Sequence, residues 1–177
     1  MQEQKTALLV IDAQIGPLWG TYKKEETLSV IQHIIAKAEK ASITIIYIQH
    51  EELPGGMLAK GSPFWQFTPE ISPRPEDFVI PKQAADAFYQ TTLTDELQKR
   101  EINHLVVTGV RTEYCIDTTC RAAITRGFHV TLVEDGHTSA DAVIPAETII
   151  QHHNHTLRTI GTPDRSIHVL PADQIVF

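Results

Sequence analysis

Three residues of this sequence have side chains that together could cleave a carbonyl compound: Cys115, Asp12 and Lys82. Cys115 lies between an apolar run and a helical pattern, and a cysteine in the first turn of a helix faces free backbone N–H groups. Those groups would lower the pKa of the thiol and could receive an oxyanion. Asp12 directly follows an apolar run, where a carboxylate withdrawn from water is a good proton acceptor. Lys82 would keep both partners anionic and stabilise charge in a transition state.

The elements that must position these residues follow from the hydrophobic pattern. Apolar runs at 7–11, 43–48, 78–80, 104–108, 128–133 and 166–170 predict strands. Helical patterns cover 28–38, 92–100, 114–125 and 145–160. This alternation predicts an α/β fold, a three-layer α/β/α arrangement with a mostly parallel six-stranded sheet, Rossmann-like in its organisation. We expect one domain over residues 1–177, because the length suits a single core and no repeat interrupts it.

The predicted sheet explains why residues far apart in sequence should meet. Open α/β sheets bind ligands at the carboxyl ends of their strands. Asp12 follows the first run, Lys82 the third and Cys115 the fourth, so we expect all three at one edge. Taken singly, each has a structural interpretation: a helix cap, a solvated loop lysine and a small core residue. Cys120, which lies further along the predicted helix, fits the core interpretation better than Cys115 does.

Further side chains near this edge are candidates for binding a polar substrate. One comes from a loop at 51–76, which holds five prolines and three glycines, and loops of that length are usually functional. It is equally open that the polar candidates are only hydrogen-bonded groups at strand ends and that the aromatic residues of the loop only anchor it to the rest of the protein. Three histidines at 152, 153 and 155 favour a polar helix face over a metal site. The candidate substrate-binding residues are Gln14, Gln49, His50, Trp65, Tyr89 and Tyr114.

The sequence around the three chemical residues resembles a known family. The segments VIDAQ (Asp12), VIPKQAADAFYQTTL (Lys82) and VTGVRTEYCIDTTCRAA (Cys115) are similar to the isochorismatase-like cysteine hydrolases, over nearly the whole chain. That family includes nicotinamidases, N-carbamoylsarcosine amidases and ureide hydrolases. The resemblance implies that Cys115 attacks an amide or ureide carbonyl and forms a thioester, with Asp12 as general base and Lys82 as orienting cation. It also implies a cis peptide at Val110–Arg111 and an oxyanion hole made by the backbone N–H groups of Arg111 and Cys115.

The chain departs from the nicotinamidases after the second predicted strand. Those enzymes hold a metal there with an Asp-x-His pair and a further histidine. Here the position reads His50-Glu51-Glu52, and no histidine follows until His104. A zinc site needs about three protein ligands with defined geometry. We therefore expect no metal and no cofactor.

Three other functions use the same residues or the same fold. Cys115 and Arg121 have the C-x5-R spacing of cysteine-dependent phosphatases and arsenate reductases, although the loop has no glycine and Glu113 and Asp117 would repel a phosphate. A redox role would pair Cys115 with Cys120, but the spacing is not Cys-x-x-Cys. A non-catalytic binding module is the third alternative, because fold alone does not give function.

Composition limits the partners. The net charge is −7 and no segment collects lysine and arginine, which disfavours nucleic acid and anionic membranes. We expect no signal peptide at the start, no apolar run is long enough to span a bilayer, and two cysteines are too few for a disulfide scaffold. We expect a cytoplasmic enzyme with a small amide or ureide substrate. Helical faces and the apolar loop suggest a homodimer or a larger homo-oligomer.

Overall fold

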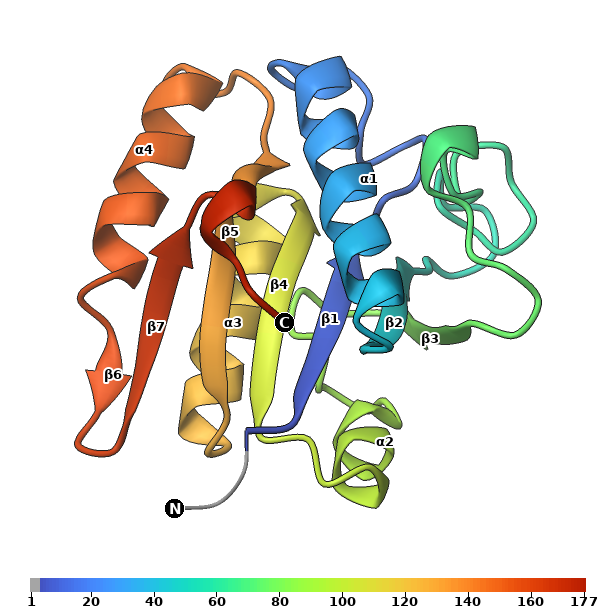
Figure 1. Cartoon of the computed structure of the whole chain (residues 1–177). Helices are drawn as coiled ribbons and strands as arrows, with labels where there is room; N and C mark the ends of the chain where they lie inside the picture. The colour runs from blue at the N-terminus through green and yellow to red at the C-terminus, as the bar shows by residue number, and fades with distance from the viewer. Residues whose placement is uncertain (1–3) are drawn as a thin grey trace.

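The computed structural model describes residues 4–177 and contains a seven-stranded sheet in the order β3-β2-β1-β4-β5-β7-β6 (Figure 1). All pairs are parallel except β6 with β7. The predicted mostly parallel α/β sheet is therefore confirmed, and the added seventh strand is the two-residue β6. The strands are β1 (Thr6–Ile11), β2 (Thr44–His50), β3 (Phe78–Lys82), β4 (His104–Val110), β5 (His129–Thr138), β6 (Gly161–Thr162) and β7 (Arg165–Leu170).

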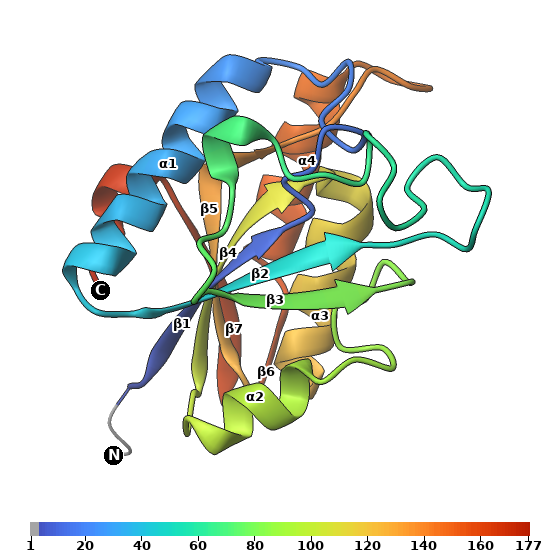
Figure 2. The same cartoon turned by 90° about the vertical axis from the view of Figure 1, so that its right-hand side faces the viewer.

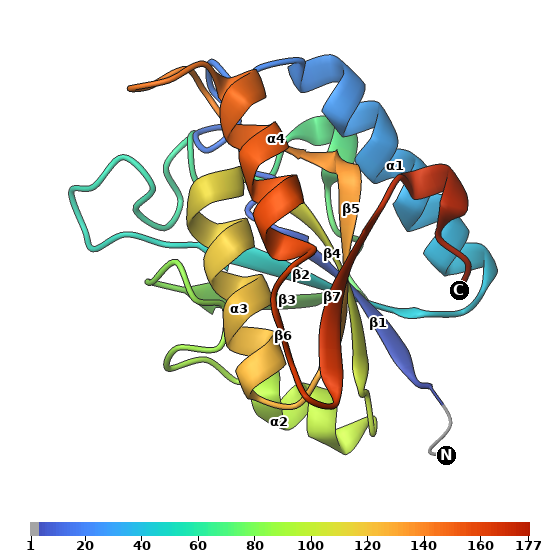
Figure 3. The same cartoon turned by 90° about the vertical axis from the view of Figure 1, so that its left-hand side faces the viewer.

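Helices cover both faces of the sheet, as Figure 2 shows. On one face lie α1 (Lys24–Lys40) and the short 3-10 helix at Ala172–Gln174. On the other lie α2 (Leu93–Lys99), α3 (Asp117–Thr125) and α4 (Ala146–Leu157), and the side view in Figure 3 shows α3 and α4 together there. None of the helices within residues 4–177 has the length and hydrophobicity that crossing a bilayer requires.

The apolar run of β1 is continuous because this strand supplies both cores. Successive side chains of a strand point to opposite faces. Leu9 and Ile11 pack with α2 and α3, whereas Leu8 and Val10 pack with α1. A central strand buried on both faces has no room for a polar side chain until it ends, and Asp12 is the first residue beyond it.

Several predicted bounds differ from the structure at the carboxyl edge. His50 and Lys82 are the last residues of β2 and β3, not loop residues after them. The helix predicted at 114–125 is divided: a π-helical turn at Thr112–Ile116 precedes α3. Cys115 therefore lies in a wide turn, and the expected first turn of an α-helix was wrong. Periodicity detects a helix but does not distinguish these hydrogen-bond patterns.

The long loop between β2 and β3 is attached to the segment that follows β1. Backbone N–H groups of Ile15 and Gly16 donate to the carbonyls of Gln66 and Phe64, and Thr68 donates to Ala13. The ring of Phe64 packs edge-on against Trp19, and that of Phe67 packs against Tyr47. Two aromatic side chains of the loop thus serve as anchors, one of the interpretations left open by the sequence.

Candidate active site

Asp12 begins the site at the end of β1. Its backbone N–H still donates to the carbonyl of Ile48, but its φ of 51° takes the chain out of the strand. Aspartate tolerates this left-handed conformation better than β-branched residues do. The carboxylate is buried, and Oδ2 accepts from Lys82 Nζ at 2.8 Å. Among residues 4–177, Oδ1 has no hydrogen-bond partner, so one oxygen remains available for a proton.

Lys82 supplies a buried cation at the centre of the site. The register of β2 and β3 places it opposite His50. Its Nζ lies 2.8 Å from Asp12 Oδ2, 3.2 Å from Cys115 Sγ, 3.1 Å from His50 Nδ1 and 3.0 Å from the carbonyl of Ala84. Burial alone would lower the pKa of this amine, but the contacts with Asp12 and Cys115 outweigh burial and raise it. The side chain is therefore a fixed ammonium ion.

Cys115 faces this ammonium from the turn after β4. Burial raises the pKa of the thiol to about 12, the charge of Asp12 adds to this effect, and Lys82 acts in the opposite direction. The lowered pKa expected from a helix N-terminus was wrong, because the thiol is removed from water and lies beside a carboxylate. The resting nucleophile is a neutral thiol, and an adjacent base is needed to activate it.

The turn that carries Cys115 is held from both sides. Gly109, with φ +128°, lies so close to β1 that a Cβ there would be 2.0 Å from the carbonyl oxygen of Ile11. The Val110–Arg111 peptide is cis, as the resemblance implied. The Arg111 guanidinium donates from Nε to the carbonyl of Pro17 at 2.9 Å and from Nη2 to that of Trp19 at 3.1 Å. These contacts link the turn to the segment after Asp12.

A buried polar network supports the same turn from β5 and α4. His137 Nδ1 lies 2.8 Å from Thr112 Oγ1, and its Nε2 lies 2.9 Å from Asn154 Oδ1. Because an amide oxygen only accepts, Nε2 carries the ring proton and Thr112 donates to Nδ1. Asn154 in turn donates to the carbonyl of Glu134. Burial lowers the pKa of His137 to about 4, so the network contains a neutral imidazole.

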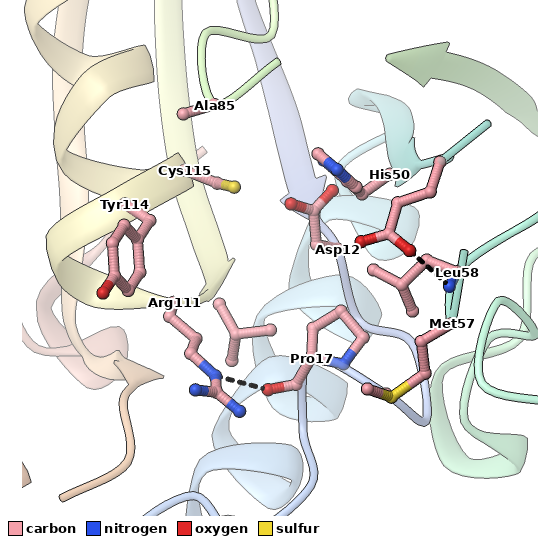
Figure 4. Close-up of a pocket in the computed structure, with 12 residues that line it drawn as sticks. Asp12, Pro17, His50, Met57, Leu58, Ala85, Arg111, Tyr114 and Cys115 are labelled. Atoms are coloured by element: carbon pink, nitrogen blue, oxygen red, sulfur yellow. Dashed lines mark hydrogen bonds between the residues drawn. The ribbon is translucent and has the colours of Figure 1, made fainter. Parts of the chain in front are cut away.

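Asp12, Arg111 and Cys115 line a pocket of about 410 Å³ (Figure 4). Five predicted site residues line it; Lys82 is not a lining residue but contacts Asp12 and Cys115, which are. Glu52, Met57 and Leu58 of the long loop also line the pocket and were not among the predicted site residues. Only Glu52 could have been found from the sequence, because it lies two residues after His50. The lining residues are Asp12, Gly16, Pro17, His50, Glu52, Met57, Leu58, Ala85, Val110, Arg111, Tyr114 and Cys115.

Four predicted substrate-binding residues do not line this pocket: Gln14, Gln49, Trp65 and Tyr89. The Gln14 amide donates to the carbonyls of His50 and Trp65 and accepts from the His50 N–H. Gln49 also donates to the Trp65 carbonyl. Both glutamines therefore bind the loop backbone, because a buried carbonyl needs a donor. The exposed Tyr89 side chain lies elsewhere on the surface.

The two cysteine-based alternatives are not supported by the geometry. Arg121 Nε is paired with Asp117 Oδ2 at 2.7 Å on α3, and Arg121 does not line the pocket. This pairing opposes a phosphatase in which an arginine clamps an anion beside Cys115. Both cysteines are free thiols, and Cys120 is fully buried in the core. A redox pair would need an accessible second thiol.

A nicotinamidase-type metal does not fit the donor set. Within residues 4–177, the group spaced to hold a metal is Asp12, His50 and Cys115, whose ligand atoms lie within 4.8 Å of one another. Each of these three residues also has a polar atom within 3.2 Å of Lys82 Nζ: Asp12 Oδ2, His50 Nδ1 and Cys115 Sγ. The ammonium ion is in contact with all three residues, so a divalent cation bound by them would lie close to a fixed positive charge.

An open α/β sheet with a cysteine, a carboxylate and a lysine at its carboxyl edge is the architecture of an α/β enzyme. The isochorismatase domain model matches residues 6–162, and the chain belongs to the isochorismatase family. This confirms the resemblance found in the sequence. An isochorismatase from Pseudomonas putida KT2440 has a TM-score of 0.88 at 28% identity, covering 99% of this chain and 94% of that one.

Two curated relatives carry names of hydrolytic enzymes. Streptothricin hydrolase of Streptomyces noursei is 32% identical over 143 residues, which are 79% of this chain and 56% of that protein. Ureidoacrylate amidohydrolase of Cronobacter sakazakii is 28% identical over 172 residues, covering 75% of this chain and 74% of that protein. The chain spans about half the length of the streptothricin hydrolases that it matches.

Proposed function

We propose that this protein is a cysteine hydrolase that cleaves a C–N bond of a small amide or ureide. The observation that carries the proposal is the contact of one buried ammonium with both a carboxylate and a thiol: Lys82 Nζ lies 2.8 Å from Asp12 Oδ2 and 3.2 Å from Cys115 Sγ. Family membership and the hydrolase names of the relatives support it.

The first half of the reaction acylates the enzyme. Cys115 Sγ attacks the carbonyl carbon while the thiol proton passes to the carboxylate of Asp12, whose Oδ1 has no partner among residues 4–177. The carbonyl oxygen becomes an oxyanion, and the backbone N–H groups of Arg111 and Cys115 would receive it. Asp12 then returns the proton to the leaving nitrogen, the C–N bond breaks, and a thioester with Cys115 remains.

The second half releases the acid. A water molecule gives one proton to Asp12 and attacks the thioester carbonyl, and the C–S bond breaks as Cys115 recovers a proton from Asp12. Lys82 stays charged throughout and stabilises the thiolate whenever it forms. The products are a carboxylic or carbamic acid and ammonia or an amine.

The test is ammonia release from a panel of small amides and ureides by wild type, Cys115→Ser and Cys120→Ala. We expect turnover by wild type and by the Cys120→Ala control, none by Cys115→Ser, and a covalent acyl adduct on Cys115 by mass spectrometry. Normal turnover by the Cys115→Ser protein would rule out the nucleophile. Failure of the whole panel would favour the binding-module alternative.

We also propose that the protein assembles as a homodimer or larger homo-oligomer. Trp19, Met57 and Tyr114 have exposed apolar side chains, of which Met57 and Tyr114 line the pocket, and contact with a second copy would remove them from water. Light scattering after size exclusion should give a mass of at least two chains. A monomeric mass at all concentrations would contradict this.

A further inference from the structure

The chemistry of His50 is fixed by its neighbour Lys82. The ammonium has three hydrogens and lies near four acceptors, one of which is His50 Nδ1 at 3.1 Å. An ammonium ion donates hydrogen bonds and cannot accept them. Nδ1 must therefore present its lone pair to Lys82, and the ring proton of a neutral His50 must lie on Nε2.

The charges around His50 favour its neutral form. Burial lowers the pKa of the imidazole, and the positive charge of Lys82 lowers it further; Asp12 and Glu52 act in the opposite direction. Protonation would bring an imidazolium against the fixed ammonium, with no lone pair left at Nδ1. His50 is therefore a neutral imidazole in one tautomer at neutral pH.

The protonated nitrogen has no partner in the protein. His50 lines the pocket beside Asp12 (Figure 4). Within residues 4–177, Nε2 makes no hydrogen bond and is not among the buried polar atoms that lack one, so it reaches space open to a ligand. A donor at a pocket wall, with its tautomer fixed in advance, is prepared to bind an oxygen atom.

Glu52 supplies an acceptor on the same wall. It lies two residues beyond His50 and also lines the pocket. One carboxylate oxygen accepts from the Leu58 N–H at 3.0 Å, which fixes the side chain and leaves the other oxygen free of partners among the described residues. His50 and Glu52 line the same pocket, and the Glu52 charge acts to raise the pKa of His50. Such a donor and acceptor complement a group in which a carbonyl oxygen and an N–H are adjacent.

We propose that His50 and Glu52 form a recognition site for a second carbonyl–N–H unit of the substrate, with His50 Nε2–H donating to its oxygen and Glu52 accepting from its nitrogen. This proposal rests on the proposed amide or ureide hydrolysis and narrows the substrate class. Substrates with two carbonyl–N–H units, only one of which is cleaved, are then favoured over simple monoamides. His50 also positions Lys82 by accepting one of its protons.

Two substitutions separate the roles of His50. Asparagine places an amide oxygen near the Nδ1 position and can still accept from Lys82. Glutamine places an amide nitrogen near the Nε2 position and can still donate to the substrate, whereas phenylalanine can do neither. His155→Gln on the exposed face of α4 is the matched control.

The kinetic test compares biuret, which has a second carbonyl–N–H unit, with acetamide, which has none. For biuret we expect His50→Phe and His50→Asn to raise KM about tenfold with a smaller change in kcat, His50→Gln to stay within about threefold, and the control to match wild type. Glu52→Gln should also raise KM for biuret. For acetamide, none of these variants should raise KM more than it changes kcat. An unchanged KM for biuret in His50→Phe, or a wild type that prefers acetamide, would overturn the recognition site while leaving the proposed hydrolysis standing.

A second measurement does not depend on activity. In protein labelled with ¹⁵N-histidine, long-range ¹H–¹⁵N spectra distinguish the two neutral tautomers and the imidazolium, and the His50 signals are identified by their loss in His50→Gln. We expect the Nε2–H tautomer at neutral pH, and in Lys82→Met a higher imidazole pKa, because the ammonium that lowers it is gone. An Nδ1–H tautomer or an imidazolium would overturn the proposal even if the amide panel fails.

Discussion

Replacement of Asp12 by asparagine should change the reactivity and the catalytic activity of Cys115 in opposite directions. The charge of Asp12 helps to raise the pKa of the thiol, and Lys82 acts to lower it. Removing the carboxylate charge leaves the ammonium as the nearest charge, 3.2 Å from Sγ. We therefore expect a lower thiol pKa and faster alkylation in Asp12→Asn. Hydrolysis should fall by about 10²- to 10⁴-fold, because the general base is lost.

The size of the effect follows from the pKa of about 12. Relative to an ordinary thiol of pKa about 8.5, the thiolate fraction at neutral pH is lower by about 3000-fold. A thiolate of higher pKa is intrinsically more nucleophilic, which recovers about 50-fold at a Brønsted slope of about 0.5. In the wild-type protein without a ligand, Cys115 should thus be alkylated about 60-fold more slowly than an exposed cysteine. Each unit by which asparagine lowers the pKa should speed alkylation about threefold.

The assay is reaction with iodoacetamide, quenched at intervals and read by peptide mass spectrometry. Cys120 is an internal control, because it is fully buried in the core and should remain unmodified until the protein unfolds. Circular dichroism checks that the variant is folded. Alkylation of wild type at the rate of an exposed thiol would refute the raised pKa. Slower alkylation in Asp12→Asn than in wild type would refute the statement that Asp12 raises the pKa of Cys115 and Lys82 lowers it.

Three further predictions concern stability. Gly109→Ala should lower the free energy of unfolding in urea by about 3 kcal/mol or more, because its Cβ would meet the backbone of β1 at 2.0 Å. The control Gly127→Ala, at φ +88° with open space around it, should lower it by about 1 kcal/mol. Equal losses in the two variants would contradict this prediction. Lys82→Met should destabilise the folded protein by about 3–5 kcal/mol, because it leaves the buried carboxylate of Asp12 unpaired. Adding Asp12→Asn should restore the stability but not the activity. A destabilisation that persists in the double variant would argue against the ion pair. Burial lowers the pKa of His104 and of His137 to about 4, so the unfolded chain takes up protons first as pH falls below about 6.5. Each histidine should therefore lower the free energy of unfolding by about 2 kcal/mol between pH 7.5 and pH 5. A free energy of unfolding that stays constant over this range would contradict the neutral imidazoles.

Much of the fold and the placement of the three chemical residues followed from the sequence. A strand buried on both faces is apolar at most positions, so β1 and β4 are recognised by their apolar runs, although β4 also contains the buried Thr108. Parallel strands share one carboxyl edge, and Asp12, Lys82 and Cys115 each come at or just after a strand end. The structure brings these three side chains into contact as expected from strand order alone.

Other features depended on contacts between distant segments. The loop wall of the pocket, with Glu52 and Leu58, exists because residues 64–68 pair with 13–16, and no local pattern encodes that pairing. Gln14 was expected to face the substrate, but its amide donates to the carbonyls of His50 and Trp65, which are distant from it in the sequence.

The sequence by itself determined which chemical groups this protein has and which sheet edge they reach, because hydrophobic periodicity and the order of strands along the chain can be read directly from the sequence. Only the tertiary structure decided their ionisation. A pKa depends on burial and on charges a few ångströms away, so a cysteine expected to be acidic became a neutral thiol beside Asp12. The same physics made Lys82 a fixed cation and left His50 neutral, with its remaining proton available to a ligand.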